Sequence, residues 1–233
     1  MFPQKNIRIR SRVQVIAILL VSLFWGVSCQ KTTEIVQDTE RNPSAIRRIL
    51  VLPFQDVSSI YGENVSIRCQ LCSSVFTTGK VEPTATQFLT KQLNEMLDRA
   101  NNFDLIPASQ AQGVISSLLR QSEKELPEID LYMKTGQALN ADGVLAGYVY
   151  QFKDRDGSDY SVNQPASVTF HLDMIQVKGG QVVWSGHFNE TQRSLSEDLF
   201  QLGNFIRRKG RWISVEDLAV YGLEQILKTL PPS

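Results

Sequence analysis

Two cysteines separated by two residues, Cys69 and Cys72, are the pair in this sequence best suited to chemistry. A Cys-x-x-Cys pair serves as a redox couple, as half of a metal site, or as a small structural disulfide. A redox couple has its first cysteine at a helix N-terminus, where the helix dipole lowers the thiol pKa. Segments 65–68 and 75–78 instead alternate apolar and polar residues as strands do, which disfavours a redox pair.

The other two uses of the pair are a zinc site and a disulfide. The segment 68–76 looks like one knuckle of a zinc ribbon, but a closed tetrahedral site needs four ligands and the chain has no second Cys-x-x-Cys. Zinc binding would therefore require His171 and His187, or a second copy of the chain. We favour a disulfide between Cys69 and Cys72, because the N-terminus described below is typical of an exported protein, which meets an oxidising compartment. Such a short closed loop would fix local geometry more than global stability.

The two histidines fall on neighbouring predicted strands, 167–177 and 181–191. The alternating apolar residues of both strands share a face only if the Gly179-Gly180 loop has an odd number of residues. With a three-residue loop, His171 stands opposite His187, within about 5.5 Å at Cβ, and Asp173 opposes Ser185. Two imidazoles and a carboxylate can bind a metal, but the favoured interpretation is the polar face of a half-buried sheet.

No catalytic or nucleotide-binding motif is present in the sequence. It contains no G-x-S-x-G, no Walker loop and no G-x-G-x-x-G after a strand. We therefore expect a protein that is not an enzyme and that needs no cofactor, zinc being the one candidate.

The order of apolar patterns predicts one α/β domain. Strands are expected at 48–54, 103–107, 143–152, 167–177 and 181–191, and helices at 83–100, from Ser109, at 129–139 and after Ser214. This order, β-α-β-α-β-β-β-α, predicts a three-layer-like domain with a mixed sheet and helices packed on it. The connection 55–82 far exceeds the usual ~4–6 residues, so it is either functional or folds locally, as a hairpin with the cysteines at its tip.

The N-terminus has the pattern of a secretory signal peptide. A basic head precedes an apolar run, 13–29, that is shorter than the ~20 residues of a membrane-spanning helix. The run ends Gly26-Val27-Ser28-Cys29, which resembles the lipobox of bacterial lipoproteins, although Gly26 stands where leucine is usual. We expect a lipoprotein signal peptide at 1–28, a diacylated Cys29, a flexible tether at 29–46 and a periplasmic domain at 47–233. Gln30 after the anchor resembles the pattern of lipoproteins sorted to the outer membrane.

Charge argues against two classes of partner. The chain has 24 basic and 24 acidic residues, and loss of the signal peptide removes four basic ones, so 20 against 24 leaves a net charge of about −4. Nucleic acid and anionic lipid surfaces are therefore not expected partners.

The layout resembles the periplasmic domain shared by the curli secretion lipoprotein CsgG, the penicillin-binding-protein activator LpoB and the TolB N-terminal domain. The segments that carry the resemblance are 49–54, 141–147 and 179–185. The resemblance implies an anchored lipoprotein that works through protein contacts.

Pore-forming members of that group need two long amphipathic hairpins. The candidate segments here, 153–164 and 193–209, are polar and lack a lipid-facing stripe. We therefore expect an outer-membrane accessory lipoprotein that binds envelope proteins in assembly, secretion or cell-wall regulation, with oligomers possible. The alternative is a periplasmic thiol-redox or metal-binding protein that uses residues 69–72.

Overall fold

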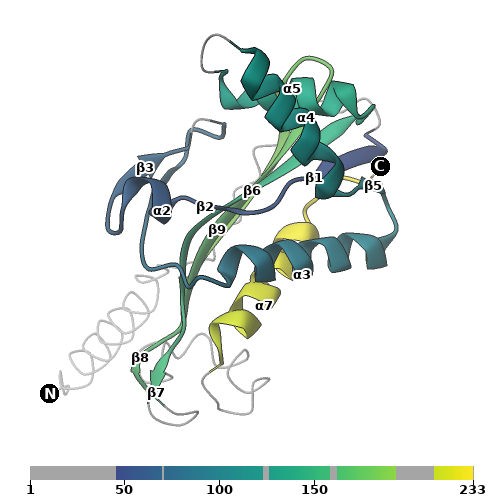
Figure 1. The fold of residues 1–233 in the computed structure, drawn as a ribbon. Coiled ribbons are helices and arrows are strands. Elements are labelled where there is room, and N and C mark those ends of the chain that lie inside the picture. The colour runs from purple at the N-terminus through teal and green to yellow at the C-terminus, as the bar shows by residue number, and fades with distance from the viewer. Residues whose placement is uncertain (1–45, 70, 123–125, 158–161, 193–212, 233) are drawn as a thin grey trace, which may run out of the picture. The chain divides into compact units, whose positions relative to one another are not determined.

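The computed structural model describes residues 46–69, 71–122, 126–157, 162–192 and 213–232 (Figure 1). The predicted signal peptide, Cys29, almost all of the tether and the candidate pore segment 193–209 lie outside these residues. Within the described part of the chain, no helix is both long enough and apolar enough to span a bilayer.

The described elements follow the predicted order, with short additions. The strands are β1 (Arg48–Val51), β2 (Gln55–Asp56), β3 (Ser66–Arg68), β4 (Val75–Thr77), β5 (Asp104–Ile106), β6 (Gly143–Lys153), β7 (Asp156–Gly157), β8 (Val162–Gln164), β9 (Ser167–Gln176) and β10 (Gln181–Thr191). The helices are α2 (Ser58–Tyr61), α3 (Ala85–Ala100), α4 (Ala108–Gln121), α5 (Glu128–Ala138) and α7 (Val215–Leu227). The mixed α/β fold predicted from the sequence is confirmed.

The central sheet has the order β10-β9-β6-β1-β5, with β2 also paired to β6. β1 runs parallel to β5 and β6, whereas β6, β9 and β10 form an antiparallel meander. The predicted strand 48–54 stops at Val51, and the chain pairs with β6 again at β2. The sheet is therefore parallel on the β1 side and antiparallel on the β10 side.

Each face of the sheet has its own apolar core. On one face, α7 packs against β9 and β10, and α3 packs against α7 and β6; the core between them includes Phe170, Leu172 and Phe188. On the other face, α4, α5 and the β3–β4 hairpin cover residues such as Val144, Ala146 and Ile175. These are the three layers that the sequence predicts.

The β9–β10 register confirms the predicted facing pairs but not the predicted loop. His171 pairs with His187, and Asp173 with Ser185. The loop has four residues, 177–180, because Gln176 pairs with Gln181, and a bulge between Val182 and Trp184 supplies the odd residue. The prediction of a three-residue loop was wrong. The alternation of apolar residues requires only that the turn and any bulge together add an odd number of residues, and it does not say how many belong to each.

The long connection 55–82 folds locally, as expected. It contains β2, α2 and an antiparallel hairpin, β3–β4, in which Ile67 pairs with Phe76 (Figure 1). The tip of this hairpin carries Cys69 and Cys72.

Two helical glycines give a matched test of this packing. A Cβ on Gly222 of α7 would lie 2.5 Å from the Phe188 ring, whereas one on Gly113 of α4 meets nothing within 4 Å. We expect Gly222→Ala to destabilise the domain by about 1–3 kcal/mol through overpacking. Gly113→Ala should stabilise it by about 0.5–1 kcal/mol, since alanine favours an open helical position. Urea unfolding of both variants measures this, and equal effects would contradict the α7–sheet contact.

Candidate metal centre

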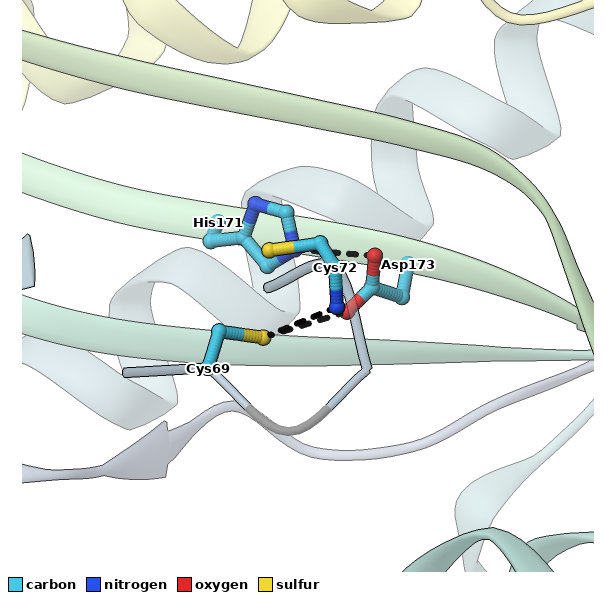
Figure 2. Close-up of side chains that lie close together, drawn as sticks. All are labelled: Cys69, Cys72, His171 and Asp173. Atoms are coloured by element: carbon cyan, nitrogen blue, oxygen red, sulfur yellow. Dashed lines mark hydrogen bonds and ion pairs between the residues drawn. The ribbon is translucent and has the colours of Figure 1, made fainter. Parts of the chain in front are cut away.

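Four side chains that can ligate a metal meet where the hairpin tip covers β9. Cys69, Cys72, His171 and Asp173 each place one ligand atom in a group whose members all lie within 4.8 Å of one another (Figure 2). The two cysteines come from the hairpin, and His171 and Asp173 come from β9. Asp173 lies 104 positions after Cys69 in the sequence. The group therefore links two elements far apart in the sequence.

Phe76 of β4 holds the hairpin against the sheet. Its ring stacks on Tyr150, with centroids 4.4 Å apart, and lies 5.3 Å from the ring of His171. It also contacts His187 edge-on at 5.8 Å. Because Phe76 is buried in this aromatic group, the hairpin tip stays over the polar residues of β9.

A tight turn directs both thiols toward the sheet. The Cys72 N–H donates to Cys69 Sγ at 3.4 Å, and the Ser73 N–H donates to the Cys69 carbonyl at 3.1 Å. The Cys69 N–H in turn donates to the Ser74 carbonyl at 2.8 Å. Ser73 adopts the left-handed backbone conformation, φ 62°, which closes the turn. An N–H···S bond of this kind stabilises a thiolate.

His171 and Asp173 are buried, with exposed fractions of 1% and 0%. The His171 Nε2 lies 2.8 Å from Asp173 Oδ1, within ion-pair distance. The angle of this contact is not that of a hydrogen bond, however. Within the described part of the chain, neither ring nitrogen of His171 has a hydrogen-bond partner. The Asp173 carboxylate also accepts a hydrogen bond from Ser185 Oγ and lies 4.0 Å from Cys69 Sγ. The prediction of a half-buried polar face was wrong for His171 and Asp173, which the hairpin covers, whereas His187 is half-buried.

The charges of the group depend on one another. Interaction with the Cys69 thiol, and further with His171, lowers the pKa of Cys72 to about 3 despite its burial. Interaction with Cys72, together with burial, raises the pKa of Cys69 far above its usual range. Burial lowers the pKa of His171, but the neighbouring Asp173 and Cys72 outweigh it and raise that pKa to about 9. The directions of these shifts favour a thiolate at Cys72 beside a protonated His171.

The sequence named all four of these residues, but in two separate hypotheses. One joined Cys69 and Cys72 to the two histidines, and the other joined the two histidines to Asp173, which period-two alternation puts on the same face as His171. His187, the other expected ligand, pairs with His171 in the sheet yet lies outside the four-residue group. Cys69 and Cys72 are free thiols in the structure, so their disulfide stays a prediction, as does acylation of Cys29.

The burial of the group favours a structural role over catalysis. A thiolate, an imidazole and a carboxylate are also the parts of a cysteine nucleophile system. A substrate would have to reach His171, however, and that ring is covered by Phe76, Tyr148 and the hairpin tip. A closed site in which the protein supplies all four ligands is typical of structural zinc.

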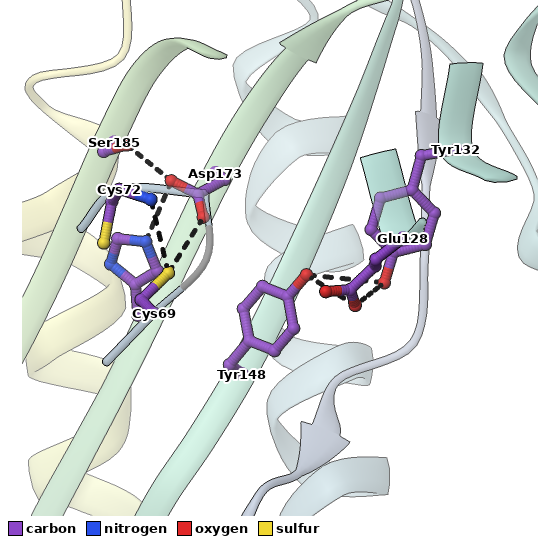
Figure 3. A network of polar contacts seen from close by, with 8 residues as sticks. Cys69, Cys72, Glu128, Tyr132, Tyr148, Asp173 and Ser185 are labelled. Carbon is purple, nitrogen blue, oxygen red and sulfur yellow. Dashed lines mark hydrogen bonds and ion pairs between the residues drawn. The ribbon is translucent and has the colours of Figure 1, made fainter. Parts of the chain in front are cut away.

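A second polar group adjoins the first through Tyr148 of β6 (Figure 3). Its ring lies 6.4 Å from that of His171, and its hydroxyl donates to Glu128 Oε1 at 2.9 Å. Tyr132 donates to the same oxygen at 2.6 Å and accepts from Gln55 Nε2. Burial raises the pKa of both tyrosines well above their usual range. This group connects α5 and β2 to β6.

Comparisons with known proteins place part of the chain near one family. Residues 79–189, slightly less than half of the chain, match the family described as peptidoglycan-synthase activator LpoB. This segment runs through α3, α4, α5, β6, β9 and almost all of β10. Of the three groups expected from the sequence, the match supports an LpoB-like fold and neither CsgG nor TolB specifically. A search of curated proteins gives no match.

Several solved structures are distantly similar. A PelC dodecamer from Paraburkholderia phytofirmans is 14% identical, with 87% of this chain and 100% of that one covered and a TM-score of 0.49. The LpoB C-terminal domain from Escherichia coli is 18% identical over 75% and 94% of the two chains, with a TM-score of 0.38. The lipoprotein GNA1162 from Neisseria meningitidis is 15% identical over 79% and 99%, at 0.39. These TM-scores lie below 0.5, so the likenesses carry no inference about partners or assembly.

Removal of the Phe76 ring tests whether it anchors the hairpin. Phe76→Ala should lower the free energy of local opening by about 3 kcal/mol, since a buried phenylalanine is lost. Amide hydrogen exchange should then speed up in β3 and β4 but not in β6. Val75→Ala is the matched control, because Val75 is 59% exposed on the same strand, and it should change exchange by about 0.5 kcal/mol or less. Similar exchange in both variants would show that the ring does not hold the hairpin.

Proposed function

We propose that this chain is a lipid-anchored envelope protein that binds a peptidoglycan synthase on the periplasmic side of the outer membrane and activates it. The observation that carries the proposal is the match of residues 79–189 to the family of peptidoglycan-synthase activators. The protein itself catalyses no reaction in this proposal; it acts by contact. Its partners are envelope proteins, and it reaches them from a membrane-bound position.

The proposed anchor supplies that position. The lipobox-like Gly26-Val27-Ser28-Cys29 supports diacylation of Cys29, and the polar segment that follows supports a tether. A tethered domain meets a membrane-bound synthase at a raised effective concentration, so a modest contact suffices for activation.

Residues inside the family match are the first place to look for the contact surface. A contact shared by a family of activators should lie within the segment that the family shares. Among the described residues, the large apolar side chains that are most exposed are Ile60, Tyr61, Val65, Val75 and Leu119. Leu119 of α4 is the one of these that falls within residues 79–189. It is 53% exposed, so an added charge there would not disturb the core.

Lipid labelling tests the anchor. Cells fed an alkyne-bearing palmitate should label the wild-type chain, and its mature mass should correspond to a diacylated chain that begins at Cys29. Cys29→Ser should carry no label. Cys72→Ser is the matched control and should be labelled like the wild type, because it leaves the lipobox intact. Equal labelling of the Cys29→Ser chain would refute the anchor.

Synthase activation tests the function. The full chain, in detergent micelles with a purified peptidoglycan synthase of the same bacterium, should raise the rate of glycan-strand synthesis from lipid-linked precursor. Leu119→Glu should raise the concentration needed for half-maximal stimulation about tenfold, since about 1.4 kcal/mol of contact energy is lost.

Ile60→Glu is the control for that substitution. Ile60 is 64% exposed and lies outside residues 79–189, so the variant should stimulate like the wild type. No stimulation by the wild-type chain from any of the bacterium's synthases would contradict the proposed function.

A further inference from the structure

We propose that Cys69, Cys72, His171 and Asp173 bind a zinc ion, which fastens the β3–β4 hairpin to the central sheet. This site goes beyond the proposed function, because nothing in activation by contact requires a metal, and two of its four ligands, Cys69 and Cys72, precede the segment that matches the LpoB family. It would be a structural centre that joins residues inside and outside that segment.

The four ligand atoms are close to tetrahedral spacing. With bonds of about 2.0–2.3 Å, a tetrahedral zinc ion holds its ligand atoms roughly 3.3–3.8 Å apart. The four atoms here lie within 4.8 Å of one another, so the largest gap has to close by about 1 Å, and the 2.8 Å between His171 Nε2 and Asp173 Oδ1 has to open by about 0.5 Å where these two atoms are the ligands. The cysteines can make that movement, since they sit on a hairpin rather than in the central sheet.

The donor set selects the metal. Two thiolates and one imidazole favour zinc over magnesium and calcium, which prefer oxygen ligands. The Asp173 carboxylate is a recognised fourth ligand of zinc. It is already held by a hydrogen bond from Ser185 Oγ, the kind of outer-shell contact that orients a metal-ligating carboxylate.

An incompletely satisfied imidazole is the independent sign of a ligand. His171 is 1% exposed, and neither ring nitrogen has a hydrogen-bond partner in the described part of the chain. Nε2 keeps its 2.8 Å ion-pair contact with Asp173, so the cost of burying the ring is only partly offset. The ring lies beside Asp173 and Cys72, so a metal bound among these residues would satisfy one nitrogen. A disulfide between the cysteines would give neither ring nitrogen of His171 a new partner.

The turn at the cysteines is also built for thiolate ligands. The Cys72 N–H donates to Cys69 Sγ, and the left-handed Ser73 brings the chain back so that both sulfurs face β9. Figure 2 shows the two cysteine side chains lying close to those of His171 and Asp173. The hairpin and the sheet each contribute two ligands, so the ion would cross-link them.

Metal analysis of the full chain, purified from membranes in detergent with its thiols trapped by alkylation, tests the site. We expect about one zinc ion per chain, and Cys69 and Cys72 both recovered as alkylated thiols. After the zinc is removed under reducing conditions, Co²⁺ should give the strong visible bands of tetrahedral coordination and a thiolate charge-transfer band. A metal-free chain with a Cys69–Cys72 disulfide, or a reduced chain that gives no tetrahedral Co²⁺ spectrum, would overturn the proposal.

Variants separate this site from chance binding at the surface. Cys72→Ser and Asp173→Asn should each lower zinc affinity by at least about 100-fold, and Ser185→Ala by about 10- to 100-fold as an outer-shell change. His187→Gln is the control, because His187 neighbours His171 in the sheet but is not one of the four ligands; it should bind zinc like the wild type. Unchanged zinc content in Cys72→Ser would refute the site. The Co²⁺ spectrum of the wild-type chain decides the matter even where a variant fails to fold.

Discussion

The pairing of β9 with both β6 and β10 is the constraint on which the rest of the structure depends. Because side chains alternate along a strand, a shift of one residue would exchange the two faces of β9. In the observed register, Phe170 and Leu172 enter the core under α3 and α7, while His171 and Asp173 point to the hairpin. The four-residue turn would break that parity, and the bulge between Val182 and Trp184 restores it. The same pairing of β9 with its two neighbours therefore places the polar group on one face and the apolar core on the other.

The two faces of the sheet are stabilised differently. The α3–α7 face is almost wholly apolar, with the Trp184 ring N–H donating to Thr229 at its edge. The opposite face buries a histidine, an aspartate and two hydrogen-bonded tyrosines beneath the hairpin and α5. Burying such groups costs free energy unless they are paired. The hairpin is therefore more than a long connection, since it closes a polar site that the sheet alone would leave open to water.

The fold could be predicted from the sequence because its signals are local. The stripe of α3, the alternation of β9 and the serine cap of α7, where Ser214 accepts from the Asp217 N–H, are each set by neighbouring residues. The position of the cysteines relative to β9 is not local. It depends on how Phe76 packs on Tyr150, a contact between segments about 75 residues apart that no spacing in the sequence reveals. This is why sequence reasoning found the Cys-x-x-Cys and the His171–Asp173 pair separately, and why it included His187, which lies outside the group of four.

The position of β1 has a mechanical consequence. The described chain begins at Ile46, a buried residue, and runs almost directly into β1, which is bonded to parallel neighbours on both sides. Consider a pull on Ile46 that is directed along β1. It would therefore load the hydrogen bonds to β5 and β6 together, in shear, rather than opening them one after another. A domain held through a central strand resists such tension better than one held through an edge strand, which would suit the lipid anchor proposed above.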